Sequence, residues 1–232
     1  MISSRRTLVL AVAAAWLLEH VVPFGRLLLY PFTLLATWVH ETGHGLAALA
    51  TGGSFERLRI FWDASGFAEI RGAPGWRVAV MALGGLLAPP IVGAVLLAVA
   101  RGPRRARIAV AVLAGGLIAS LALWVRSPAG FVVVPVTAAL FAWAALRWSD
   151  DRRVLLAQFV AVTLALDTLG RMVSYAFTSS VVVDGKESAS DVAQVAKALG
   201  GPAILWGALV VVVALVLLAA GAWVAWRKRP AR

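Results

Sequence analysis

The sequence predicts an all-α polytopic membrane protein, with about seven transmembrane helices and a small β-hairpin after the second helix. The first reason is composition: 61% of the 232 residues are hydrophobic and only 14% are charged. Soluble domains average about 45–50% apolar and about 25% charged residues. The second reason is that the apolar residues form long runs with Arg and Lys clustered between them. The third is a single stretch in which apolar and polar residues alternate.

The charge pattern indicates a membrane rather than a nucleic acid as the partner. The net charge is +11, but the basic residues gather at the ends of the apolar runs and at 227–229. This arrangement is typical of residues that set topology and contact anionic lipid headgroups. The chain has no cysteine, so disulfides and thiolate metal ligands are excluded. Rich Ala, Val and Arg with scarce Lys are typical of a GC-rich bacterium, so we expect a multi-pass protein of a bacterial inner membrane.

Seven apolar runs are predicted to cross the bilayer within one domain that covers residues 1–232. The first is expected to be a retained helix, because no small-residue cleavage site follows it. The third contains Gly84-Gly85 and Pro89-Pro90, and proline removes helix donors, so we expect it to be kinked or broken. An odd number of crossings places the termini on opposite sides, and the positive-inside rule favours a cytoplasmic C-terminus. The predicted spans are 7–22, 27–50, 76–100, 108–125, 131–146, 154–177 and 202–226.

Two connections carry local structure of their own. Residues 54–72 alternate with period two around a Gly-containing turn, which predicts a β-hairpin. Residues 178–201 form a polar loop, in which 184–187 read as a turn. Ser190 or Asp191 is the expected N-cap of a short helix in that loop.

A metal-binding motif lies in the second apolar run, at His40, Glu41 and His44. Two histidines four residues apart lie on one face of a helix, so both imidazoles can reach one ion. This is the HExxH pattern of zinc hydrolases, in which the glutamate holds the metal's water. Charged and ionisable groups are costly inside a membrane and mark functional sites there. The alternative is a pair of core histidines without a metal.

A catalytic zinc needs a third protein ligand besides its water. The remaining histidine, His20, is expected to form an interfacial pair with Glu19. Asp167 is the one acidic residue well inside a late apolar run, where a charge costs ~2.5–3.5 kcal/mol. Counted from residues 27 and 154, Asp167 falls at a membrane depth similar to that of His40 and His44, in a parallel helix. The sequence therefore permits a site of these three residues.

Two alternatives to this ligand set stay open. Arg171 follows Asp167 by four residues and can neutralise it in an intrahelical pair, or it can face substrate. Asp191 is the rival third ligand, on the same side of the membrane as the hairpin, or else it caps a helix.

Several of these features together resemble the site-2 protease family of intramembrane zinc metallopeptidases. The similarity is greatest to its compact bacterial B-type branch, which has no PDZ domain. The resemblance implies that His40 and His44 bind zinc and that Glu41 is the catalytic base. The better-known members carry an Asp-Gly pair with a nearby Asn-Pro motif, whereas Asp167 is followed by Thr168. The features that carry the resemblance are residues 40–45, 47–48 and 51–53, the hairpin, Gly84-Gly85, Pro89, Asp167, Ser190-Asp191 and Trp206-Gly207.

The expected activity is hydrolysis of a peptide bond in or near the transmembrane segment of a membrane protein or peptide substrate. Zn²⁺ would lower the pKa of a bound water to about 7 and polarise the carbonyl. Glu41 would take the water's proton and hand it to the leaving amine. An extended substrate could add to the hairpin edge as another strand. The alternatives are a catalytically inactive, protease-like scaffold or binding protein that retains the metal, and a transporter with buried His and Asp.

Overall fold

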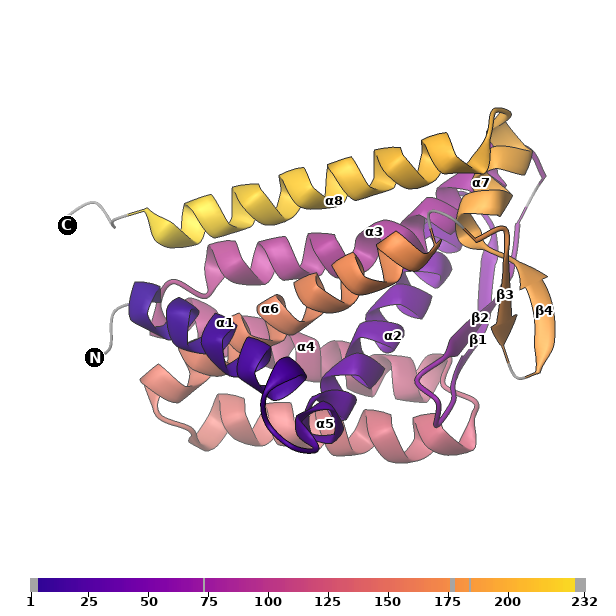
Figure 1. Ribbon diagram of the computed structural model, residues 1–232. Coiled ribbons are helices and arrows are strands. Elements are labelled where there is room, and N and C mark those ends of the chain that lie inside the picture. Colours follow the sequence, from indigo (N-terminus) through magenta and orange to yellow (C-terminus); the bar gives the residue numbers. More distant parts are fainter. Residues whose placement is uncertain (1–3, 73, 176–177, 184, 228–232) are drawn as a thin grey trace.

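The computed structural model describes residues 4–72, 74–175, 178–183 and 185–227, with the side chains of 171–175 and 186 left out. Within these ranges the chain forms eight helices and four short strands (Figure 1). The termini lie at one end of the molecule, and both hairpins and the short helix α7 lie at the other. The elements are α1 (Ser4–His20), α2 (Gly25–Ala50), β1 (Ser54–Ile60), β2 (Gly66–Arg71), α3 (Trp76–Val99), α4 (Pro103–Leu123), α5 (Pro128–Arg147), α6 (Asp150–Tyr175), β3 (Ser180–Val183), β4 (Lys186–Ala189), α7 (Asp191–Leu199) and α8 (Ala203–Trp226).

The protein is a multi-pass membrane protein, but the predicted count of seven spans is not confirmed by its described residues. In the described part of the chain, α3, α4, α5, α6 and α8 are each long and apolar enough to cross a membrane. Helices α1 and α2 meet that test only as a pair, and they are bent by 116° relative to each other. Counting this pair as one broken span gives six crossings. An even number agrees with the two termini lying at the same end (Figure 1).

The bend between α1 and α2 lies part-way along the bundle rather than at its far end. Arg5 Nε donates to the carbonyl of Trp226 at 2.7 Å, which joins the start of α1 to the end of α8. With a rise of 1.5 Å per residue, the 17 residues of α1 cover about 25 Å and the 24 of α8 about 36 Å. Helix α1 therefore stops short of the far end. The bend is so tight that a Cβ on Gly25 would lie only 2.0 Å from the Leu18 carbonyl oxygen, so the position requires glycine.

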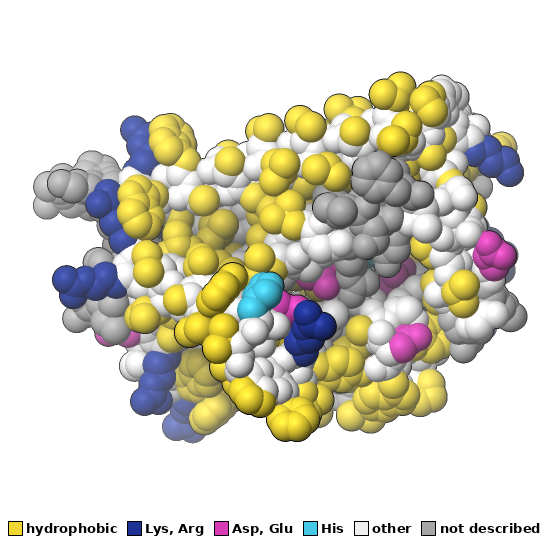
Figure 2. Space-filling view, viewed as in Figure 1, with side chains coloured by type: hydrophobic (Ala, Val, Ile, Leu, Met, Phe, Trp, Pro, Cys, Tyr) yellow, Lys and Arg dark blue, Asp and Glu magenta, His cyan; other side chains and the backbone are white. Residues whose placement is uncertain are grey.

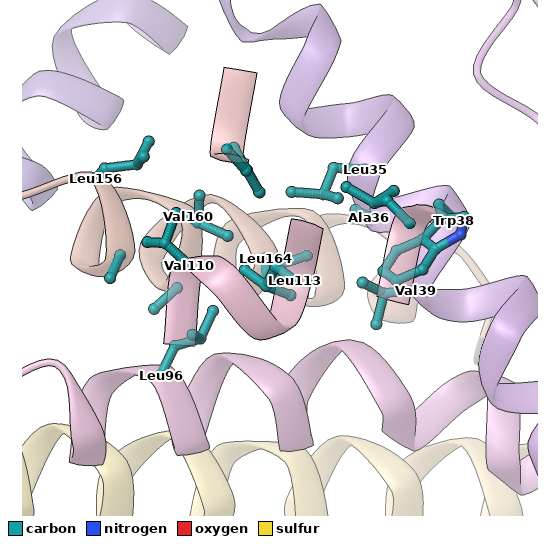
Figure 3. Packing of buried hydrophobic residues seen from close by; sticks show 14 of the residues in the cluster. Leu35, Ala36, Trp38, Val39, Leu96, Val110, Leu113, Leu156, Val160 and Leu164 are labelled. Atoms are coloured by element: carbon teal, nitrogen blue, oxygen red, sulfur yellow. The ribbon is translucent and has the colours of Figure 1, made fainter. Parts of the chain in front are cut away.

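The core is formed where α2, α3, α4 and α6 meet (Figure 3). Helices α2 and α3 touch through glycine: a Cβ on Gly43 would lie 2.4 Å from the carbonyl oxygen of Gly84. Small residues allow this close approach between helices in lipid. Helix α3 runs without a break through Pro89 and Pro90, so of the two expected outcomes, a kink or a break, the break is not found. The buried apolar side chains labelled in Figure 3 are Leu35, Ala36, Trp38, Val39, Leu96, Val110, Leu113, Leu156, Val160 and Leu164.

The outer surface is suited to a lipid environment. Figure 2 shows hydrophobic side chains spread over one face of the helices, and Lys and Arg side chains gathered at the end that holds the termini. Helix α8 exposes a continuous series of large apolar residues. Apolar surface of this extent marks contact with membrane or with other proteins. The exposed apolar residues of α8 are Ile204, Leu205, Leu209, Val212, Leu215, Val216, Trp223 and Trp226.

The predicted hairpin at residues 54–72 is confirmed as the antiparallel pair β1–β2. The other edge of β1 is occupied by the connection between α4 and α5. Leu58 N–H donates to the Trp124 carbonyl at 2.7 Å, and Arg126 N–H donates to the Leu58 carbonyl at 2.9 Å. Ser127 Oγ accepts from Ile60 N–H at 2.9 Å. These bonds fix the hairpin to the helical core through β1. The outer edge of β2 therefore faces away from the α4–α5 connection.

A second hairpin, β3–β4, was not predicted from the sequence. Its signal is present in the printed residues: three successive valines at 181–183 are followed by Asp184-Gly185. Valine favours strands, and Asp-Gly between two strands is a strong hairpin signal. The predicted short helix after it is confirmed as α7, with Ser190 at the N-cap.

Candidate metal centre

Helix α2 brings His40 and His44 to one side, one turn apart. Their Nε2 atoms are 3.1 Å apart. His44 Nδ1 lies 2.8 Å from the carbonyl oxygen of Met81 in α3. Because that oxygen can only accept, Nδ1 carries the proton and Nε2 of a neutral ring keeps its lone pair. Histidines that bind metals commonly donate their other ring N–H to a backbone carbonyl, which fixes the tautomer and the orientation of the ring.

The third group at this point is Asp191, in the first turn of α7. Its Oδ2 lies 3.1 Å from His40 Nε2 and 3.3 Å from His44 Nε2. Ser190 Oγ accepts from Ala193 N–H at 3.2 Å as the helix cap and donates to the Thr178 carbonyl at 2.8 Å. This cap holds the start of α7, and therefore the Asp191 side chain, against α2.

Of the two acidic residues that the sequence allowed as third ligand, the described structure brings Asp191, the rival, to the two histidines, and not Asp167, the expected one. Among the described residues, the group of side chains that could hold an ion is His40, His44 and Asp191. The depth argument counted α2 from residue 27 as if it began at one end of the bundle, but α2 begins at a bend part-way along it. Counting from its start therefore misplaces His40 relative to α6. Arg171, the alternative partner of Asp167, lies outside the described side chains.

The three ligand atoms have the spacing that a tetrahedral zinc ion requires. With bonds of about 2.0–2.1 Å, tetrahedral geometry separates ligand atoms by about 3.3–3.4 Å. The three observed separations are 3.1, 3.1 and 3.3 Å. Two imidazoles and one carboxylate also match the ligand types of catalytic zinc. The residues therefore fit the metal that the sequence motif implies.

Glu41 lies beside the ligands and is held by the first hairpin. It is buried and lines the same cavity as the two histidines. The backbone N–H of Ala68 in β2 donates to its carboxylate. A Cβ on Gly66 would lie 2.7 Å from Glu41 Cγ, so only glycine permits this approach of the strand. One turn earlier, Thr37 Oγ1 donates to the Ala64 carbonyl at 2.7 Å and fixes the hairpin tip to α2.

Helix α3 closes the opposite wall of the site. A Cβ on Gly85 would lie 2.2 Å from both Cε1 and Nε2 of His44. The imidazole therefore rests directly on the helix backbone. The Gly84-Gly85 pair, which the sequence marked as a possible helix break, serves close packing against α2 instead.

The site opens into a cavity of about 710 Å³. Its walls come from α2, α3 and α7 and from both hairpins. The parts supplied by the hairpins are residues 65–70 of the first and residues 180–183 and 188–189 of the second. The cavity is thus wide enough for a chain segment and has strand edges on two sides.

The surroundings of Asp191 keep its carboxylate ionised. Burial by itself would raise the pKa of this carboxyl group, but the adjacent His44 and His40 lower it well below the ordinary range. An ionised carboxylate next to two imidazoles favours a divalent cation over a neutral ligand.

A comparison with protein families agrees with this arrangement of residues. The family model described as Peptidase M50B-like matches residues 7–221. The chain belongs to this family. The match confirms the resemblance to the site-2 proteases and extends over the whole helical bundle, including both hairpins and α7. No curated protein and no solved structure matches the chain.

Sequence reasoning named Asp191 only as a rival ligand and missed the supports around it. The signal for Asp191 was its place after a Ser N-cap, on the same side of the membrane as the first hairpin. The Met81 carbonyl and the backbone of Ala68 could not be found from residue types, because a backbone group looks the same at every position.

Proposed function

We propose that this M50B-like peptidase is a zinc endopeptidase that cleaves a peptide bond in or near a transmembrane segment of a membrane protein or peptide substrate. The observation that carries the proposal is the convergence of His40, His44 and Asp191 at zinc-like spacing, with the Glu41 carboxylate in the same cavity. A purely structural metal site has no use for a buried glutamate beside it.

Zinc, when bound by these three residues, supplies a Lewis acid that acidifies a water molecule and polarises the peptide carbonyl. Glu41 accepts the proton of the attacking water and passes it to the leaving amine. The Ala68 N–H bond orients this carboxylate before substrate arrives. The Met81 carbonyl and the Ser190 cap hold His44 and Asp191 in place, as supporting groups do around metal ligands.

The decisive experiment is Glu41→Gln in purified protein with a model single-span substrate. The variant should keep one zinc per chain and lose at least about 100-fold in cleavage rate, the lower part of the range for a general base. Glu69→Gln, in the same hairpin wall, is the matched control and should retain most activity. Full activity of Glu41→Gln would end the proposal. Zinc binding by a wild-type protein that cleaves no substrate would favour the scaffold alternative instead.

We also infer that the end with the termini faces the cytoplasm of a bacterial cell and that the cavity opens toward the other side. The positive-inside rule supports this, since most Lys and Arg lie at the terminal end. A fluorescent protein fused to either terminus should fold and fluoresce, while alkaline phosphatase fused there should be inactive; the reverse pattern would contradict the orientation. The described basic residues at the terminal end are Arg5, Arg6, Arg101, Arg104, Arg105, Arg107, Arg147, Arg152, Arg153 and Arg227.

A further inference from the structure

We propose that the substrate is held as an extended strand between β2 and β3, so that it pairs with one hairpin on each side. This inference rests on the proposed function and adds the second hairpin to it. The two hairpins form separate two-stranded sheets, ordered β1–β2 and β3–β4. Within the described residues, β2 and β3 each have one edge that pairs with no strand. Both edges line the cavity that contains the metal ligands.

The hydrogen bonds of β1 show which groups of β2 face the cavity. Leu58 and Ile60 bond outward, to the α4–α5 connection. Their partners across the hairpin are Ala68 and Gly66. In an antiparallel ladder, residues of such a pair both direct their N–H and C=O groups away from each other. Gly66 and Ala68 therefore direct their backbone groups to the outer edge of β2, and the bond from Ala68 N–H to Glu41 agrees with this. Because that N–H is engaged by Glu41, the groups left for a substrate strand are the Ala68 carbonyl and both backbone groups of Gly66.

The same reasoning applies to β3. Ser190 N–H donates to the Ser179 carbonyl at 3.1 Å, in register with the β3–β4 pairs. Ser179 and Val181 thus face β4, and the alternation turns the backbone groups of Ser180 and Val182 to the other edge. The Val182 side chain is 68% exposed. Its position on the cavity wall suits contact with an apolar residue of a bound segment.

A strand between these two edges would extend each hairpin and form a five-stranded sheet with the substrate in the middle. Strand pairing of this kind draws affinity from the main chain, and pockets for alternate side chains give the selectivity. The expected substrate is therefore a segment that leaves the helical state easily. Its ability to adopt an extended conformation should matter more for selection than the identity of any one side chain. Pairing with β2 lays that segment along Glu41, because Ala68 connects the edge to the carboxylate.

Cross-linking tests the two-sided arrangement without depending on cleavage. The chain has no cysteine, so each introduced cysteine is the only thiol. In the Glu41→Gln background, Phe67→Cys reports on β2 and Val182→Cys on β3. The probe is a synthetic single-span peptide with a Val- and Gly-containing segment beside the apolar stretch, and one cysteine is moved along that segment. Val136→Cys, exposed on α5, is the control for random collision in the membrane.

Both strand positions should form disulfides with the probe, in yields that alternate with a period of two residues along it. Val136→Cys should give only background. Cross-links to Phe67→Cys alone, or yields without alternation, would overturn the two-sided arrangement while leaving the protease proposal intact. If the same cysteine variants cross-link in this pattern but, with Glu41 intact, cleave no probe, the result would instead refute the proposed hydrolysis and support the strand site.

A kinetic variant gives a second readout. Val182→Pro removes the outward N–H of β3 but no donor of the β3–β4 ladder, and proline is tolerated at strand edges. Its KM should rise about twofold to tenfold, the effect of one net hydrogen bond, with kcat and zinc content unchanged. Val182→Ile keeps the N–H, the branched shape and the apolar contact, and its KM should stay close to that of the wild type. An unchanged KM in Val182→Pro would contradict pairing at this edge.

Discussion

Helices α6 and α7 each carry an acidic residue that the sequence allowed as the third metal ligand, and they differ in how their positions are fixed. Asp167 lies within a 26-residue helix of the membrane bundle. Asp191 lies in the first turn of a 9-residue helix, after a hairpin and outside the candidate membrane spans. Among the described residues, Asp191 is the acidic residue grouped with the two histidines, with its Oδ2 within 3.3 Å of both Nε2 atoms. A short capped helix at the end of a bundle can thus complete a site that a long spanning helix does not reach.

The largest effect should come from exchanging the two carboxylates for amides. Asp191→Asn removes the anionic ligand and should weaken zinc binding by more than about 100-fold, since even supporting residues around a metal give 10- to 100-fold effects. Asp167→Asn should bind zinc like the wild type. Chelator competition with purified protein measures both. Wild-type affinity in Asp191→Asn together with a loss in Asp167→Asn would reverse the comparison.

The difference between Asp167 and Asp191 also shows how much of the metal site could be predicted from the sequence. His40, Glu41 and His44 were predictable because four-residue spacing on a helix brings side chains together regardless of the rest of the fold. The first hairpin and the α7 cap were predictable from local patterns. The place of α2 relative to α6 was not, because it depends on the bend before Gly25, where the backbone passes so close to Leu18 that a Cβ would not fit. The predicted count of seven spans is not confirmed for the same reason, since the bent pair of α1 and α2 was counted as two spans.

A smaller effect should follow from adding one methyl group to the α3 wall. Gly85→Ala would place a Cβ 2.2 Å from the His44 ring, and overpacking of this kind costs about 1–3 kcal/mol. If the cost falls on His44, zinc affinity drops about 5- to 150-fold. Gly115→Ala in α4 is the control, because a Cβ there meets nothing within 4 Å. Equal zinc affinities in the two variants would mean that the Gly85 backbone does not support the His44 imidazole.

The smallest effect should come from the cap that positions Asp191. Ser190→Ala removes the hydroxyl that accepts from Ala193 N–H and donates to the Thr178 carbonyl. Loss of an N-cap costs about 0.5–2 kcal/mol, which corresponds to about a 2- to 30-fold loss of zinc affinity if the start of α7 loosens. Ser190→Thr keeps the hydroxyl and should recover most of the affinity. If Ser190→Ala matches the wild type, the cap does not hold Asp191 in place.

X-ray absorption at the zinc edge tests the central claim most directly, because it reports the atoms bound to the ion in the purified protein. We expect two imidazole nitrogens at about 2.0–2.1 Å and a carboxylate oxygen at about 2.0–2.2 Å. In the same measurement, Asp191→Asn should lose the carboxylate contribution and Asp167→Asn should leave the spectrum unchanged. A wild-type protein without zinc, or a carboxylate contribution that disappears with Asp167→Asn and persists with Asp191→Asn, would contradict the assignment of His40, His44 and Asp191 as the metal centre.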